Sequence, residues 1–202
     1  AKKVLPVMEG ATFFNYATRD QGRAFACHSK LHARTLTGMQ GTPVFLWVGR
    51  LDHNKDPLTV LAGFEKIVSH FFHARLYMIY SSSQLEKAVR SQINASPALS
   101  ACVTMLGAVP HEQLQLYYES ADYFVSGSHT EGSSYALSEA LSCGCIPIVT
   151  DIPSLRAMTD NGRLGSLWQA GNTRAFVEAV LRVTCKSIPE ASSACRRFWI
   201  DH

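Results

Sequence analysis

Glu131 and Glu139 lie on either side of a turn of small residues, 132–134, near the middle of the chain. The turn leads from a short apolar segment, 123–126, into a helix-like segment that begins at Tyr135. A helix that starts beside the end of a strand directs free backbone N–H groups at a ligand and favours an anion. Carboxylates accept hydrogen bonds from hydroxyl groups. The element therefore predicts a site for a phosphorylated sugar.

Two cations follow an earlier apolar segment, 44–48, in the turn that begins at Gly49. Arg50 and Lys55 have the charge and spacing to flank a diphosphate. The alternative is a solvated turn in which Lys55 pairs only with its neighbour Asp56. Because this turn also follows a strand, we favour the phosphate interpretation.

Each carboxylate also has an ordinary explanation. Glu131 has the position of a charge at a helix N-terminus, and Glu139 that of a surface glutamate. Glu139, however, is followed by Ala140 and Leu141 in an apolar helix, where a buried carboxylate needs a partner. A ligand hydroxyl group is one such partner.

The elements that must position these residues alternate along the chain in the pattern of βαβ units. This pattern predicts an α/β fold, a doubly wound Rossmann-like parallel sheet with helices on both faces and a ligand crevice at the carboxyl ends of the strands. Before residue 43 we expect a strand and one helix at most. The expected strands are 44–48, 76–80, 103–106, 123–126 and 146–150, and the expected helices are 57–71, 85–93, 111–120, 135–141 and 174–183.

Composition excludes several classes of protein. A net charge of +3 with scattered Lys and Arg argues against a nucleic-acid partner. No apolar run approaches the roughly 20 residues that span a bilayer, and no signal-peptide pattern opens the chain, so we expect a cytoplasmic protein with reduced cysteines. Cys143 and Cys145 lack a second pair at a zinc-site spacing, which argues against metal binding.

Together these residues resemble the carboxyl-terminal, donor-binding domain of GT-B fold glycosyltransferases, with most similarity to glycosyltransferase family 4, also called group 1. The resemblance covers most of residues 43–183 and no other part of the chain well. The residues that carry it are Phe45 to Leu51 with Lys55, Leu106 to Val109, Tyr118 with Ala121 and Asp122, Glu131 to Ala140, and Cys143 to Val149.

The resemblance implies transfer of a sugar from a nucleotide-diphosphate donor, with retention of configuration and without a metal or other cofactor. Arg50, Lys55 and Glu131 would be the catalytic residues, the two cations on the diphosphate and Glu131 on the sugar. Glu139 would hold the ribose hydroxyls. The remaining donor-binding residues would be Gly107 and Val109 near the base, Gly49 in the turn that carries the two cations, and Gly132, Ser133, Ser134 and Tyr135 near the phosphates.

The chain departs from the family pattern in two turns. Ser133 and Ser134 replace the usual aromatic residue and glycine, and Tyr80 to Ser82 stand where a glycine-rich turn is common. Both departures bear on the choice of sugar and acceptor.

The family's acceptor site belongs to an amino-terminal domain for which 202 residues leave no room. We therefore expect a leading segment or linker at 1–42, a donor-binding domain at 43–185 and a helix at 186–202 that crosses toward the missing domain. This fragment alone would be inactive, and membrane association would come only through the missing half. The alternatives are a non-catalytic nucleotide-binding regulatory domain and a GT-B epimerase or phosphorylase.

Overall fold

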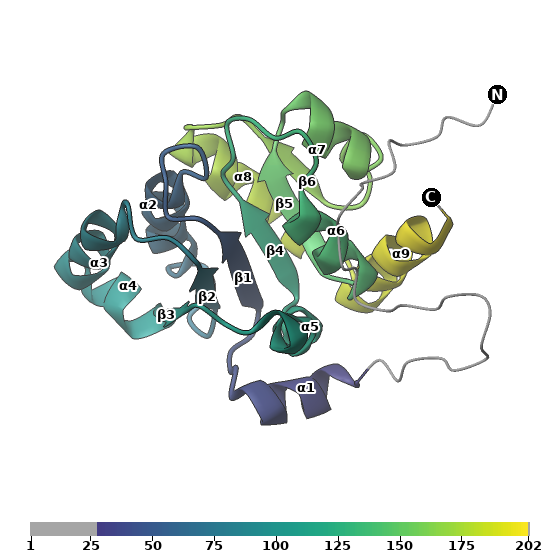
Figure 1. Ribbon diagram of the computed structural model, residues 1–202, viewed down its shortest axis with the longest axis horizontal. Coiled ribbons are helices and arrows are strands. Elements are labelled where there is room, and N and C mark those ends of the chain that lie inside the picture. Colours follow the sequence, from purple (N-terminus) through teal and green to yellow (C-terminus); the bar gives the residue numbers. More distant parts are fainter. Residues whose placement is uncertain (1–27, 202) are drawn as a thin grey trace.

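The computed structural model describes residues 28–201, which form an α/β fold around one parallel sheet (Figure 1). The order of its six strands is β3-β2-β1-β4-β5-β6. This order confirms the predicted doubly wound fold. The strands are β1 (Val44–Gly49), β2 (Arg75–Tyr80), β3 (Val103–Gly107), β4 (Tyr123–Ser126), β5 (Ile146–Thr150) and β6 (Ser166–Trp168).

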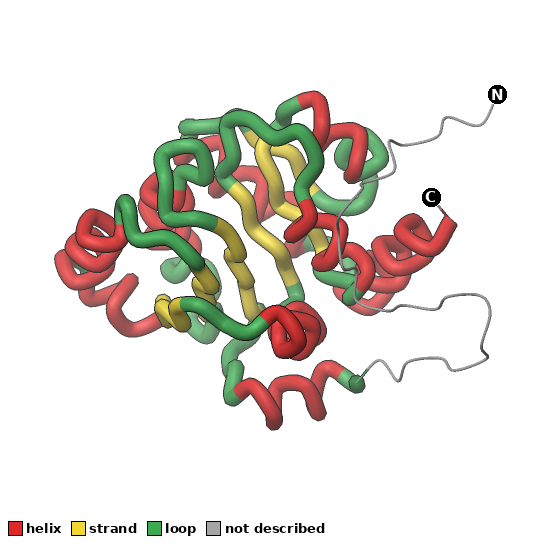
Figure 2. Tube along the Cα trace, in the orientation of Figure 1, coloured by secondary structure: helices red, strands yellow, loops and turns green. Residues whose placement is uncertain are grey.

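Helices cover both faces of the sheet, and each face has its own apolar core (Figures 1 and 2). The first face carries α2 (Pro57–Ile67), α3 (Glu86–Ala95), α4 (Pro97–Cys102) and α8 (Thr173–Thr184). The second carries α5 (His111–Ser120), α6 (Tyr135–Ser142), α7 (Pro153–Met158) and α9 (Ile188–Asp201). Helix α1 (Lys30–Thr37) packs on α5.

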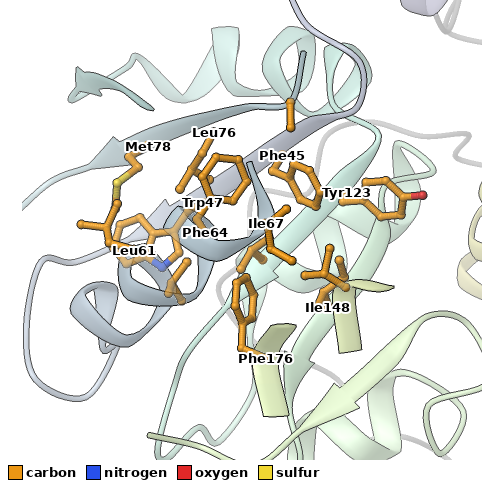
Figure 3. Packing of buried hydrophobic residues seen from close by; sticks show 14 of the residues in the cluster. Phe45, Trp47, Leu61, Phe64, Ile67, Leu76, Met78, Tyr123, Ile148 and Phe176 are labelled. Atoms are coloured by element: carbon orange, nitrogen blue, oxygen red, sulfur yellow. The ribbon is translucent and has the colours of Figure 1, made fainter. Parts of the chain in front are cut away.

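Strand β1 shows how the sequence produces this arrangement. Its side chains alternate between the two cores, with Phe45 in the first and Leu46 in the second. In the first core the ring of Phe45 stacks on Tyr123 at 5.1 Å between centroids and meets the edge of Phe64 at 5.3 Å (Figure 3). Because β1 is buried on both faces, it is apolar throughout, as parallel strands are.

Helix α2 begins as the sequence predicts. Asp56 caps it, since its Oδ1 accepts a hydrogen bond of 3.2 Å from the backbone N–H of Thr59, and Pro57 takes the first helical position. The helix ends at Ile67, however, and does not continue to residue 71 as we expected. The chain leaves the helix there for the short turn into β2.

Three elements escaped the sequence prediction: α4, α7 and β6. The two helices have six residues each, and β6 has three. Elements this short complete too few periods for a hydrophobic pattern to be recognised.

The described part of the leading segment includes α1 and its link to β1, and two buried carboxylates anchor it, Glu119, which contacts His28, and Asp122. Asp122, only 6% exposed, receives Lys30 at 2.9 Å and Arg34 at 2.8 Å, and it also accepts the N–H of Val44. Residues 28–43 contain a helix and no strand. The rest of the segment in which we expected a strand, residues 1–27, lies outside the described residues.

The last helix, α9, packs against α6. Trp199 Nε1 donates to Ser138 Oγ at 3.2 Å, and the Arg196 guanidinium donates to the carbonyl oxygen of Cys143 at 2.9 Å. That α9 also crosses to another domain stays a prediction. None of the helices between residues 28 and 201 has the length and apolar character needed to cross a membrane.

Candidate functional site

A cavity of about 440 Å³ lies at the carboxyl ends of the central strands. Strand β1 lies between β2 and β4, and the chain leaves β1 for α2 on one face but leaves β4 for α6 on the other. The loops therefore diverge and open a crevice, as the sequence predicts. Its lining residues are Val48, Gly49, Arg50, Lys55, Ile79, Tyr80, Ser81, Ala108, Val109, Leu114, Glu131, Ser133, Ser134, Tyr135 and Ala136.

Most of the predicted site residues lie in this lining, and the other three lie close to lining residues along the chain. Gly107 ends β3 with a positive φ of 78°, directly before the lining residue Ala108. Gly132 is exposed between two lining residues. Glu139 belongs to α6, one turn beyond the lining residue Tyr135.

Lys55 and Glu131 meet across the cavity wall. Lys55 Nζ contacts Glu131 Oε1, and the buried Ser128 donates a hydrogen bond of 2.8 Å to the same oxygen. Lys55 does not pair with Asp56, which caps α2 and receives His129 Nε2 at 3.0 Å. The expected pairing of Lys55 with Asp56 is therefore wrong.

Arg50 lines the cavity from the end of β1. Its Nε lies 2.9 Å from Asp52 Oδ2, and 61% of its side chain is exposed. An exposed ion pair of this kind contributes little to stability. The guanidinium therefore remains accessible to a ligand anion at the mouth of the cavity.

Asn54 joins the loops that carry Lys55 and Glu131. Its Oδ1 accepts from the N–H of Thr130 at 3.0 Å and from Thr130 Oγ1 at 2.7 Å, and its Nδ2 donates to the Thr130 carbonyl at 3.0 Å. Its backbone carbonyl also accepts the N–H of His129. Four hydrogen bonds on one residue make the two loops a single unit.

The N-terminus of α6 opens onto the same cavity. Ser134 caps the helix, with its Oγ accepting from the N–H of Leu137 at 3.3 Å, and its own O–H can still donate. Tyr135, the first residue of the helix, is 44% exposed. An anion held here would benefit from the helix dipole and the first-turn N–H groups.

Glu139 has partners within the protein and is not itself part of the cavity lining. Tyr118 Oη donates to its Oε2 at 3.0 Å, and His111 Nδ1 lies 4.0 Å from its Oε1. Burial raises the pKa of Glu139, and the hydrogen bond from Tyr118 and the charge of His111 oppose that rise. Tyr118 of α5 therefore supplies a partner for this carboxylate within the protein, where the sequence suggested a ligand hydroxyl group.

Sequence reasoning missed the roles of Asn54, Ser128 and Tyr118. The partners of Asn54 lie 76 residues away, and that of Tyr118 lies 21 residues away, so no local pattern signals these contacts. The clues that the sequence offers are the position of Asn54 beside Lys55 and the place of Tyr118 among the residues that carry the family resemblance. Among residues 28–201, no three His, Cys, Asp or Glu side chains are grouped so that they could hold a metal ion.

Comparison with known proteins gives one family. The family model described as "Glycosyl transferases group 1" matches residues 42–185. A curated relative, the GDP-mannose:cellobiosyl-diphosphopolyprenol alpha-mannosyltransferase of Xanthomonas oryzae pv. oryzae (strain PXO99A), is 29% identical over 119 residues. That match covers 58% of this chain and 31% of the relative, so the chain spans about a third of that protein.

Two solved structures share the fold. The C-terminal domain of a glycosyl transferase group 1 family protein from Francisella tularensis has a TM-score of 0.75 at 14% identity, covering 86% of this chain and 91% of that one. The pneumococcal O-GlcNAc transferase GtfA, solved with UDP and GlcNAc, has a TM-score of 0.73 at 14% identity, covering 82% of this chain and 33% of that one. The fold is therefore found both as an isolated carboxyl-terminal domain and within a longer chain.

Proposed function

Because the chain belongs to the group 1 glycosyl transferases, we propose that its cavity binds the nucleotide-diphosphate sugar from which the whole protein transfers a sugar. The observation that carries this proposal is the position of Arg50, Lys55, Glu131 and the N-terminus of α6 around one crevice. Cations and a helix N-terminus suit a diphosphate, and a carboxylate suits sugar hydroxyls. A site for phosphate alone would not need Glu131.

The proposed donor extends across the cavity from base to sugar. The base lies against Val109 and the backbone after Gly107, and the ribose lies toward Glu139 on α6. The diphosphate meets Arg50, Lys55 and the first-turn N–H groups of α6. The transferred sugar then reaches Glu131, which Ser128 and Lys55 hold in place.

In the proposed reaction the bond between the anomeric carbon and the diphosphate oxygen breaks, and the electron pair leaves with the diphosphate. An acceptor hydroxyl oxygen forms the new bond on the same face of the sugar, with retention, and its proton passes to the departing diphosphate or to solvent. Arg50 and Lys55 stabilise the negative charge that develops on the leaving group. We propose that these cations do this without a metal ion.

The acceptor would be bound by an amino-terminal domain of the same protein, which the family resemblance implies. The 202-residue chain alone would then bind the donor and turn it over poorly. We also propose that the protein works in the cytoplasm and that any attachment to a membrane comes through the missing half.

A thermal-shift panel tests the proposal. The 202-residue chain is heated with UDP, GDP or ADP, each with EDTA and each with Mg²⁺. A ligand at 100 times its Kd stabilises the folded state by about 2.7 kcal/mol, or about 5–10 °C for a chain of this size. We expect one nucleotide to shift the Tm equally under both conditions.

Two variants connect any shift to the cavity. Arg50→Ala and Glu139→Ala should each weaken binding roughly tenfold, since each removes a charged partner of the ligand. Arg174→Ala is the matched control, because it removes an exposed, paired arginine from α8, outside the cavity lining. A folded sample that no nucleotide shifts at millimolar concentration would refute the proposal.

A further inference from the structure

Tyr118 is a buried tyrosine whose hydroxyl group meets a carboxylate of the candidate site. It lies in the second half of α5 with none of its surface exposed, and its Oη is 3.0 Å from Glu139 Oε2. Its ring packs at a tilt against Phe124 of β4, with 6.2 Å between the ring centroids. Burial, and then the charge of Glu139, raise the pKa of Tyr118 well above its usual value. The hydroxyl group therefore stays protonated and donates a hydrogen bond to Glu139.

Helix α5 presents a row of residues to this region. His111, Leu114 and Tyr118 are spaced as one face of a helix. Leu114 lines the cavity, and His111 lies 4.0 Å from the second oxygen of Glu139. The carboxylate therefore lies between the two ends of this row and beside the cavity wall.

The contact with Tyr118 restricts the carboxylate in a useful way. A glutamate side chain has three rotatable bonds, so an interaction that needs one orientation of the carboxylate loses conformational entropy when it forms. The side chain of Glu139 is already 88% buried, and one oxygen is already engaged. The second oxygen and the remaining lone pair are thereby held in a fixed direction.

We propose that Tyr118 is a positioning residue for ribose recognition, whose hydroxyl group fixes the Glu139 carboxylate so that it accepts hydrogen bonds from the ribose hydroxyls of the nucleotide. The inference rests on the proposed function. Tyr118 itself does not touch the ligand. Its effect reaches the nucleotide only through Glu139.

The variant that isolates this role is Tyr118→Phe, which keeps the ring in the core and removes only the hydroxyl group. Tyr123→Phe is the matched control, because it removes the hydroxyl group of a second buried tyrosine, one that packs in the core on the opposite face of the sheet. Calorimetric titration measures the Kd of each protein for the nucleoside diphosphate chosen by the thermal-shift panel and for its 2′,3′-dideoxy form.

The expected result is a change in the ratio of the two Kd values. The unaltered chain prefers the ribonucleotide, and Tyr118→Phe weakens ribonucleotide binding by about 3- to 10-fold, the effect of one misdirected charged hydrogen bond. Binding of the dideoxynucleotide stays within about twofold, so the preference shrinks. Tyr123→Phe keeps the preference of the unaltered chain.

A second variant covers the case in which Tyr118→Phe does not fold. Glu139→Asp keeps the charge but withdraws the carboxylate from the tyrosine hydroxyl, so it should lose the same preference. An unchanged preference in either folded variant, or an equal loss for both nucleotides, overturns the inference but not the proposed function. If the unaltered chain binds no nucleotide at all, the proposed function fails and this inference fails with it.

Discussion

Replacement of Asn54 by alanine should separate sugar binding from nucleotide binding. The change removes the three side-chain hydrogen bonds to Thr130 and leaves the backbone bond to His129. Glu131 is the next residue after Thr130, so its loop loses its attachment to the loop of Lys55. On the nucleotide side, Arg50 and the N-terminus of α6 do not depend on this attachment.

The magnitude follows from the three lost bonds. A hydrogen bond contributes about 0.5–1.5 kcal/mol net, and these three are solvent-exposed, so water replaces part of each. We expect a total loss of about 1–2 kcal/mol, which lowers the Tm by about 2–8 °C for a chain of this size.

Calorimetric titration with a nucleoside diphosphate and with its hexose conjugate measures the functional effect. Asn54→Ala should weaken binding of the conjugate about tenfold and that of the free diphosphate less than about twofold, because Glu131 serves only the sugar. Asn94→Ala, an exposed asparagine in α3, is the control and should change neither. Equal losses for both ligands would refute the reasoning, since Asn54 would then support the site as a whole.

Three further predictions concern stability. Lys55→Ala and Glu131→Ala should show a coupling energy of about 1–2 kcal/mol in a double-mutant cycle of thermal unfolding. This energy lies between those of exposed and buried ion pairs. Strictly additive losses would contradict the ion pair. Gly63→Ala places a methyl group against an aromatic ring of α8 and should lower the free energy of unfolding in urea by about 1–3 kcal/mol. Gly132→Ala meets nothing within 4 Å and should leave it unchanged. Similar urea midpoints for the two variants would contradict the packing. Glu139→Gln should raise the Tm at pH 7 and weaken nucleotide binding. The raised pKa of Glu139 means that the folded state holds the proton more tightly than the unfolded state, so the carboxyl lowers stability as the pH rises from its unfolded pKa to its folded pKa. The gain in Tm should therefore vanish below the unfolded pKa of about 4.3. A gain that persists there would point to another cause.

The order of elements was predictable because it rests on local interactions. The apolar run at Val44–Gly49 and the cap and proline at Asp56 and Pro57 depend on residues a few positions apart. Short elements such as β6 carry no such pattern and were missed.

The candidate site was predictable only in part. Arg50, Lys55 and Glu131 were recognisable because each follows a predicted strand, and strands of a parallel sheet end at the same edge. That Lys55 contacts Glu131 and not its neighbour was not predictable, since a pairing across 76 residues depends on which strands are adjacent.

The sequence by itself thus determined the family, the alternation of strands and helices, and the types of charge at the ends of the strands. Only the tertiary structure decided which of these charges meet. The adjacency of β1 and β4 brings the loops of Lys55 and Glu131 together, where Asn54 joins them. The packing of α5 beside α6 puts Tyr118 on Glu139. The physical reason is that side-chain orientation in a site is set by partners distant in the chain, whereas secondary structure is set largely by near ones.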